Sequence, residues 1–233
     1  MELAVHILPY LIGLPLELLA IAGMLRFGYR RYLFVFVYVI ADFLTTVVEL
    51  PVDLSYYAGN KNKDAENSLV HFYWIDEAIM QVLVYAAVIS LIYYATAALK
   101  PRRIVRISLI GFAVLFAGVS FLIHFDPGNP KVGEWMTPWN SNLKFCSAIL
   151  DLALWVLLIA SREKDHRLLM LSGALGIQFA GDAIGQALRN LAQPHHTYWL
   201  VYTGDAAVVL FNLGFLYIVW QTFRFAKTKT LTL

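Results

Sequence analysis

Half of the acidic residues of this chain lie inside stretches that are otherwise apolar. They are Glu17, Asp42, Glu49, Asp76, Glu77, Asp151, Asp182 and Asp205, out of 16 Asp and Glu residues. A carboxylate at the centre of a bilayer costs roughly 2.5–3.5 kcal/mol on insertion scales, so such groups are rare and usually have a function or a partner. Carboxylates in these surroundings suit proton exchange or cation binding. The apolar stretches that carry them must therefore be identified first.

The composition indicates a membrane protein. The chain has 233 residues, of which 60% are hydrophobic and 15% charged, with a mean hydropathy of +0.64. Soluble domains carry about 25% charged residues. Basic residues lie in short segments between apolar stretches, so we expect no nucleic-acid partner. Cys146 is the one cysteine, which excludes an intrachain disulfide.

Seven stretches are long enough to cross a bilayer, which takes about 20 apolar residues. We therefore predict an all-α, polytopic membrane protein with a single seven-helix transmembrane bundle, and one domain over residues 1–233. Polar loops are expected over residues 52–70 and 125–141, the second marked by Pro127, Pro130 and Pro138. The predicted spans are approximately 5–25, 32–51, 71–98, 104–124, 142–160, 167–189 and 199–223.

The distribution of Lys and Arg predicts the orientation. Thirteen of the 18 basic residues fall on one side, within residues 26–31, 100–106, 162–167 and 224–229. Cytoplasmic segments carry the excess of Lys and Arg. We therefore expect the N-terminus outside and the C-terminus in the cytoplasm of a multi-pass membrane protein.

Helical spacing places the polar residues of the spans in stripes. Asp42 and Glu49 share one face of the second span, and Lys144 and Asp151 one face of the fifth. The depths of the carboxylates predict a polar cavity that opens to the outside. The fourth span has no carboxylate, so we expect it to face lipid or another membrane protein.

The leading functional hypothesis is that this cavity binds, and in a further step translocates, a cation, a proton or a basic small molecule. In this hypothesis Asp42, Glu49, Asp182 and Asp205 form an inner site, and Asp151 is a relay toward the centre. Asp76 and Glu77 attract cationic ligands at the entrance. The competing interpretation is structural: single acids pair with Arg189 or Lys144 and hold helices together. Two cations cannot neutralise eight carboxylates, which favours the functional interpretation for the set.

Two other classes of function stay open. An intramembrane lipid hydrolase or transferase would use paired carboxylates as acid and base, or a metal ion. Weak candidates for metal ligands are His71, His124, His195 and His196, whose spacing matches no zinc signature. The third possibility is a receptor-like or accessory subunit of a membrane complex.

Resemblance to known families is limited to short pieces. A retinal protein resembling the opsins would need a Schiff-base lysine in the last span. No lysine lies between Tyr198 and Phe223, so we expect no covalently bound retinal. The segments Gly181-Asp182-Ala183 and Tyr202-Thr203-Gly204-Asp205 are similar to polar helices of bacterial lysoplasmalogenases. This similarity covers only these two pieces, and we assign the chain to no family from it.

Overall fold

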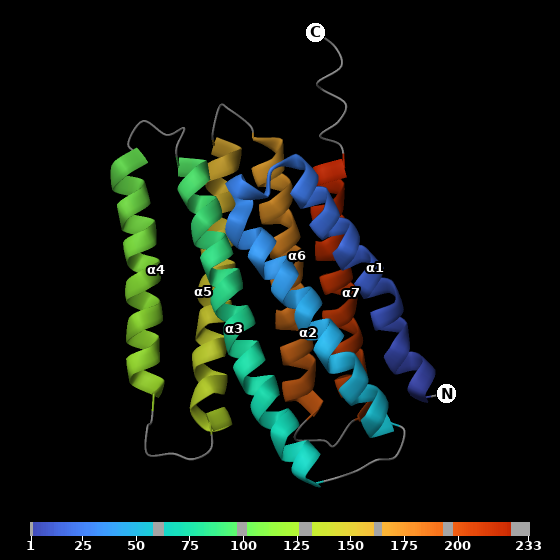
Figure 1. Ribbon diagram of the computed structural model, residues 1–233. Helices are drawn as coiled ribbons and strands as arrows, with labels where there is room; N and C mark the ends of the chain where they lie inside the picture. The colour runs from blue at the N-terminus through green and yellow to red at the C-terminus, as the bar shows by residue number, and fades with distance from the viewer. Residues whose placement is uncertain are drawn as a thin grey trace. The chain divides into compact units, whose positions relative to one another are not determined.

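The protein is all-helical, as predicted, in a computed structural model that describes residues 2–57, 63–96, 102–125, 132–160, 165–192 and 198–224 (Figure 1). Side chains are described for residues 9–51, 76–96, 103–125, 135–159, 165–192 and 199–224. In these residues, seven helices are long and apolar enough to cross a membrane. The elements are α1 (Glu2–Phe27), η1 (Tyr29–Tyr32), α2 (Leu33–Tyr57), α3 (Lys63–Ala95), α4 (Arg102–His124), α5 (Val132–Ala160), α6 (His166–Ala192) and α7 (Tyr198–Arg224).

The predicted loop over residues 125–141 is wrong in its second half, because α5 begins at Val132 rather than at residue 142. Pro138 lies inside this helix. A proline removes one backbone hydrogen bond, which neighbouring groups can compensate. Here the rings of Trp135 and Trp139 pack against Phe121 of α4, with centroid distances of 6.1 and 5.5 Å. The predicted loop over residues 52–70 is likewise too long, since α2 continues to Tyr57 and α3 begins at Lys63.

The helices group into two compact units. Unit 1 contains α1, α6 and α7, unit 2 contains α2 to α5, and η1 spans the boundary between Tyr29 and Arg30. Unit 2 is continuous in the chain, whereas unit 1 joins the first helix to the last two. The expectation of a single domain remains a prediction.

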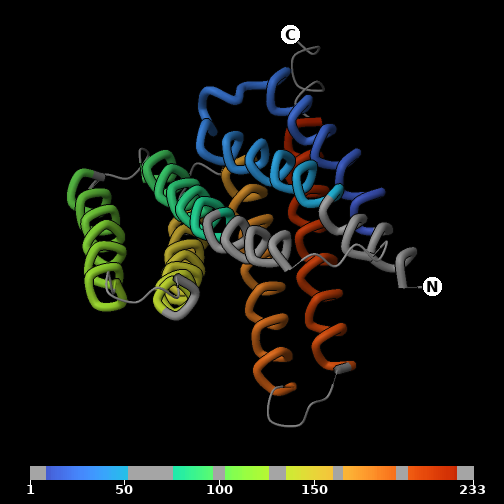
Figure 2. The backbone as a smooth tube through the Cα atoms, turned by 60° about the horizontal axis from the view of Figure 1, so that its bottom comes forward, coloured from blue at the N-terminus to red at the C-terminus, as the bar shows by residue number. Residues whose placement is uncertain are grey.

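Glycine residues set the packing of unit 1. On α6, Gly181 lies against Phe211 of α7, and Gly185 lies against Gly204, so these two helices are antiparallel. Figure 2 shows α6 and α7 side by side along their lengths. Helix α1 runs parallel to α7, because Gly13 lies near Leu213 and Gly23 near Phe223. The absence of Cβ atoms at these points allows the backbones to approach closely.

Helix α3 is central in unit 2, where it contacts α2, α4 and α5. The hydroxyl of Tyr85 on α3 donates to the carbonyl oxygen of Ala113 on α4, at 2.7 Å, and lies 3.4 Å from Cys146 Sγ on α5. One side chain thus connects three helices. Helix α4 is the most exposed, with 11% of its apolar window buried, in keeping with a helix that faces lipid or another protein.

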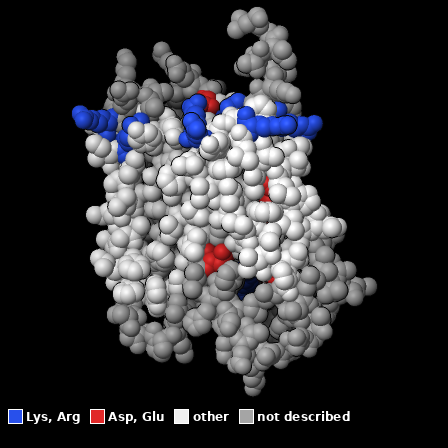
Figure 3. All heavy atoms as spheres, in the orientation of Figure 1, with Lys and Arg blue, Asp and Glu red and all other residues white. Residues whose placement is uncertain are grey.

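Most of the described basic side chains lie at one end of each unit; Arg189 and Lys144 are the exceptions. In unit 1 this end is where α1 and α7 finish and the antiparallel α6 begins; in unit 2 it is where α2 and α4 begin and α3 finishes. Arg106 of α4 donates from Nη2 to the carbonyl oxygen of Tyr93 on α3, at 3.0 Å. Figure 3 shows Lys and Arg gathered at one end of the face it displays. The described residues concerned are Arg26, Arg167 and Arg224 in unit 1, and Arg30, Arg31, Arg103 and Arg106 in unit 2. We call this the basic end of each unit.

Candidate functional site

The predicted site residues are divided between the two units. Asp182, Asp205 and Arg189 belong to unit 1, together with Glu17. The other five predicted residues, Asp42, Glu49, Asp76, Glu77 and Asp151, belong to unit 2. The grouping of Asp42 and Glu49 with Asp182 and Asp205 into one inner site remains a prediction.

In unit 1, Asp205 is bound to Arg189. The Nε and Nη2 atoms of Arg189 donate to the same carboxylate oxygen of Asp205, at 2.9 and 2.7 Å. The close approach of α6 and α7 at Gly185 and Gly204 places the two side chains within reach. Both side chains are substantially exposed, 39% for Arg189 and 50% for Asp205. Such a pair contributes at most about 1 kcal/mol in water. Asp205 thus has the partner that the structural interpretation expects, and its role in ligand binding remains a prediction.

Asp182 lies on the polar side of α6, one turn beyond Gln178. The amide of Gln178 donates to Asn212 Oδ1 of α7, at 3.4 Å. Asp182 itself is partly buried, whereas Glu17 on α1 is fully buried. Polar contacts in this unit thus connect helices that already pack closely.

In unit 2, the adjacent residues Asp76 and Glu77 bind different helices. Asp76 Oδ1 accepts a hydrogen bond from Thr45 Oγ1 of α2, at 2.7 Å. Glu77 Oε1 lies 3.0 Å from Lys144 Nζ of α5 and forms an ion pair with it. Consecutive residues of an α-helix point about 100° apart, which explains the two directions. The two carboxylates therefore contact different helices, and Glu77 forms an ion pair with Lys144. Their action together at an entrance remains a prediction.

Helix α5 carries a buried polar stripe on one face. Asn140, Lys144, Ser147 and Asp151 follow at intervals of four, three and four residues. Asn140 is 2% exposed, and Ser147 and Asp151 are also buried. Neither Nδ2 nor Oδ1 of Asn140 has a hydrogen-bond partner among the described residues. Asn140 was not among the predicted site residues because it falls in the predicted loop over residues 125–141. Its position one turn before Lys144 is the signal in the sequence that points to it.

Helix α3 contributes Gln81, one turn beyond Glu77 and one turn before Tyr85. Gln81 is 4% exposed, and its Nε2 has no hydrogen-bond partner within the described part of the chain. Since Tyr85 contacts Cys146 and α3 runs parallel to α5, Gln81 lies in depth between the Glu77–Lys144 pair and Tyr85. We call Glu77, Gln81, Asn140, Lys144, Ser147 and Asp151 the α3–α5 polar cluster.

The carboxylates of α2 extend the polar region of unit 2. The contact between Thr45 and Asp76 fixes the register of α2 against α3. Asp42 lies about one turn nearer the basic end, and its carbonyl oxygen accepts a hydrogen bond from Thr46 Oγ1 at 2.9 Å. Glu49 lies about one turn beyond Thr45, farther from the basic end. Both carboxylates are partly buried.

The histidines considered as metal ligands are described only in part. Nδ1 of His124 lies 2.8 Å from the carbonyl oxygen of Ser120 in the same helix. The imidazoles of His71, His195 and His196 lie outside the described side chains. Within the described residues, no group of three or more His, Cys, Asp or Glu side chains is placed to hold a metal ion.

Known proteins give no further guide to the site. Comparison of the chain with models of protein families, with curated proteins and with solved structures finds no match.

Proposed function

We propose that this chain is an integral membrane protein that binds a proton or a small hydrated cation at the α3–α5 polar cluster of unit 2. In this proposal the seven apolar helices cross the membrane, and the basic ends lie on the cytoplasmic side. The N-terminus is outside and the C-terminus is cytoplasmic. In a further step of this hypothesis, the protein would translocate the bound ion across the membrane.

The observation that carries the proposal is the presence of two buried amides, Asn140 before the Glu77–Lys144 ion pair and Gln81 beyond it. A buried polar group without a hydrogen bond costs about 1–3 kcal/mol. Asn140 offers both a donor and an acceptor, and Gln81 offers a donor. A water molecule both donates and accepts, so a water-bearing ligand satisfies this combination. A hydrated cation or a protonated water chain has that chemistry, whereas an apolar ligand does not.

The charges of unit 2 favour a cationic ligand. Away from the basic end, the described side chains of this unit include five carboxylates and a single cation, Lys144. Lys144 binds Glu77, while Asp151 lies buried on the same face of α5. Carboxylate, hydroxyl and amide oxygens are the ligands that hard cations prefer. A cation that enters the cluster would compete with the Lys144 ammonium for Glu77.

Thermal unfolding of the purified protein in detergent tests the proposal. The unfolding midpoint would be followed from pH 5 to 8, with and without sodium, calcium, zinc and small amines. A ligand that binds only the folded state stabilises by RT ln(1 + [L]/Kd), which is about 2.7 kcal/mol at a hundred times the Kd. We expect one cation, or the proton, to raise the midpoint in the wild type. Asn140→Leu should abolish that response, and Asp151→Asn, about 16 Å farther along α5, should weaken it by removing a buried negative charge.

Two matched Asp→Asn variants serve as controls. Asp165 caps the start of α6, where its Oδ1 accepts from the backbone N–H of Arg167 at 3.1 Å, so Asp165→Asn should keep the response. Asp182→Asn should also keep it, although the grouping predicted from the sequence requires its loss. A wild-type response that is unchanged in both Asp151→Asn and Asn140→Leu would refute the assigned site. A midpoint insensitive to every cation and to pH would refute cation and proton binding.

The described residues favour neither the lipid hydrolase nor the receptor-like subunit, so ion binding is proposed alone.

A further inference from the structure

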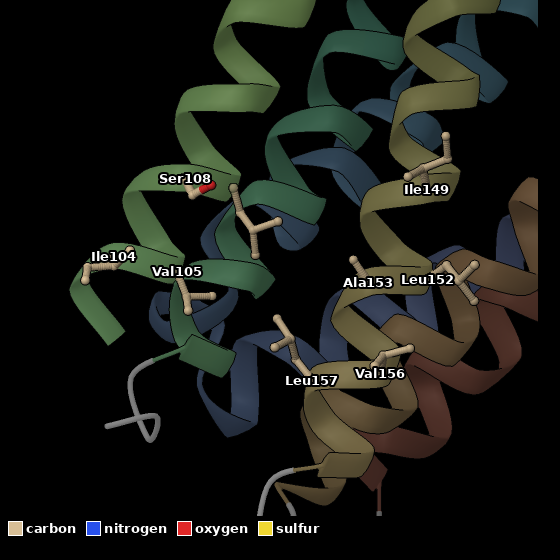
Figure 4. Close-up of a pocket in the computed structure, with 9 residues that line it drawn as sticks. Ile104, Val105, Ser108, Ile149, Leu152, Ala153, Val156 and Leu157 are labelled. Atoms are coloured by element: carbon tan, nitrogen blue, oxygen red, sulfur yellow. The ribbon is translucent and has the colours of Figure 1, made fainter. Parts of the chain in front are cut away.

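A long apolar groove lies between α4 and α5 in unit 2, on the half of these helices nearest the basic end. It has a volume of about 630 Å³, which is within the range of ligand pockets. Figure 4 shows side chains of the two helices on either side of it. The lining includes Val105, Ser108 and Leu109 of α4, and Ala153, Val156 and Leu157 of α5. Ser108 is the one polar side chain among the lining residues.

The groove exists because α4 is held at other points. Near the opposite end, the rings of Phe121 and Trp139 join α4 to α5. At the basic end, Arg106 joins α4 to α3 instead: its Nε donates to Thr96 Oγ1 at 3.3 Å, and its guanidinium lies over the ring of Tyr93. Between these points the side chains of Ser108 and Ala153 are small and leave the space between α4 and α5 open.

Positive charge is concentrated where the groove reaches the basic end. Arg103 is exposed and directly precedes the lining residues Ile104 and Val105. In the sequence, Lys100 and Arg102 precede it. A ligand with an apolar chain and an anionic head would match the groove and these charges together. An apolar chain without a charged head group would match the groove but not the charges.

We propose that the groove between α4 and α5 binds an acyl chain of an anionic phospholipid, with its phosphate held by Arg103 at the start of α4. Basic pockets between transmembrane helices on the cytoplasmic side bind anionic lipid head groups by this combination of charge and apolar contact. The groove lies on the lipid-exposed helix α4, which gives a lipid direct access from the bilayer. This site is separate from the α3–α5 polar cluster, because Ala153 and Val156 lie on a different face of α5 from Asp151.

Native mass spectrometry of the detergent-purified full chain tests the proposal. The protein would be titrated with phosphatidylglycerol and, separately, with phosphatidylcholine of the same acyl chains. We expect one anionic lipid to bind at least about tenfold more tightly than the zwitterionic lipid. Arg103→Gln should weaken this binding about fivefold, since each basic residue near anionic lipid contributes about that factor. Ala153→Phe fills the groove and should abolish the tight site.

Matched variants separate groove binding from general contact with lipid. Ile107 directly precedes the lining residue Ser108 on α4 and is 65% exposed, but it does not line the groove. Ile107→Phe should therefore bind lipid like the wild type. Arg30→Gln removes a charge from the basic end next to α2 and should have no comparable effect. Ser108→Phe is the substitute if Ala153→Phe does not fold. Equal affinity for the two lipids, or full binding by both groove-filling variants, would overturn the proposal. So would protection of the groove by a second copy of the chain, seen as a dimer that lipid does not dissociate.

Discussion

Gly181→Ala should separate α6 from α7, although it adds only one methyl group. A Cβ at residue 181 would overlap Phe211 Cβ and lie 2.7 Å from Phe211 Cγ. Ordinary contact begins at 3.4 Å. Phe211 Cβ is bonded to the backbone, so no rotation of the ring removes the overlap. The helices must therefore move apart by roughly 1 Å, which disturbs an interface packed as densely as a crystal.

The magnitude follows from two opposing terms. Overpacking of this kind costs about 1–3 kcal/mol. Alanine is a better helix former than glycine by about 1 kcal/mol, which offsets part of that cost. Gly118→Ala is the matched control, because a Cβ at residue 118 of α4 meets no atom within 4 Å. The difference between the two variants cancels the propensity term and leaves about 1–3 kcal/mol for the overlap.

Reversible unfolding in mixed micelles with increasing SDS, followed by circular dichroism, measures both variants. We expect Gly118→Ala to match or exceed the stability of the wild type. The free energy of unfolding of Gly181→Ala should be lower than that of Gly118→Ala by about 1–3 kcal/mol. Equal stability of the two variants, within about 0.5 kcal/mol, would refute the close approach of α6 and α7 at this position.

Three further predictions concern contacts of unit 2 and the topology. Tyr85→Phe removes the hydrogen bond that joins α3 to a backbone carbonyl of α4 and should cost about 1 kcal/mol in the same unfolding assay. A double-mutant cycle with Glu77→Gln and Lys144→Met should give a coupling of at least about 0.6 kcal/mol, the average for polar pairs between membrane helices; additive effects would argue against the ion pair. Cys146 is buried, so a membrane-impermeant maleimide should not label the wild type, whereas Lys229→Cys should be labelled only after the cells are permeabilised. Labelling in intact cells would reverse the predicted orientation.

Much of the fold was predictable because helix length and hydropathy are local properties. The seven apolar helices follow from stretches of the length a bilayer requires. The start of α5 was not predictable by the same means. Pro138 suggests a loop by its residue type, and the aromatic contacts with Phe121 that stabilise this turn depend on the position of α4.

The candidate site was predictable by residue type but not by arrangement. Depth along a helix can be counted from the sequence, so the polar stripe from Lys144 to Asp151 was expected and found. Which helix each polar group meets depends on helix neighbours and rotations. Asp76 and Glu77 illustrate this, because one bonds to α2 and the other to α5. Pairing with Lys144 and Arg189 was expected in the structural alternative, and such pairs are present at Glu77 and Asp205.

The division of the chain into a continuous unit and a discontinuous one has a consequence for biosynthesis. All helices of unit 2 leave the ribosome consecutively and can assemble as they are inserted. Helix α1 must wait for α7, its partner at Gly13 and Gly23. At about 5–20 residues per second, the delay between completion of the two helices is roughly 10–40 s. During that interval the glycine-lined face of the nascent first helix is available to the insertion machinery or to chaperones of the membrane.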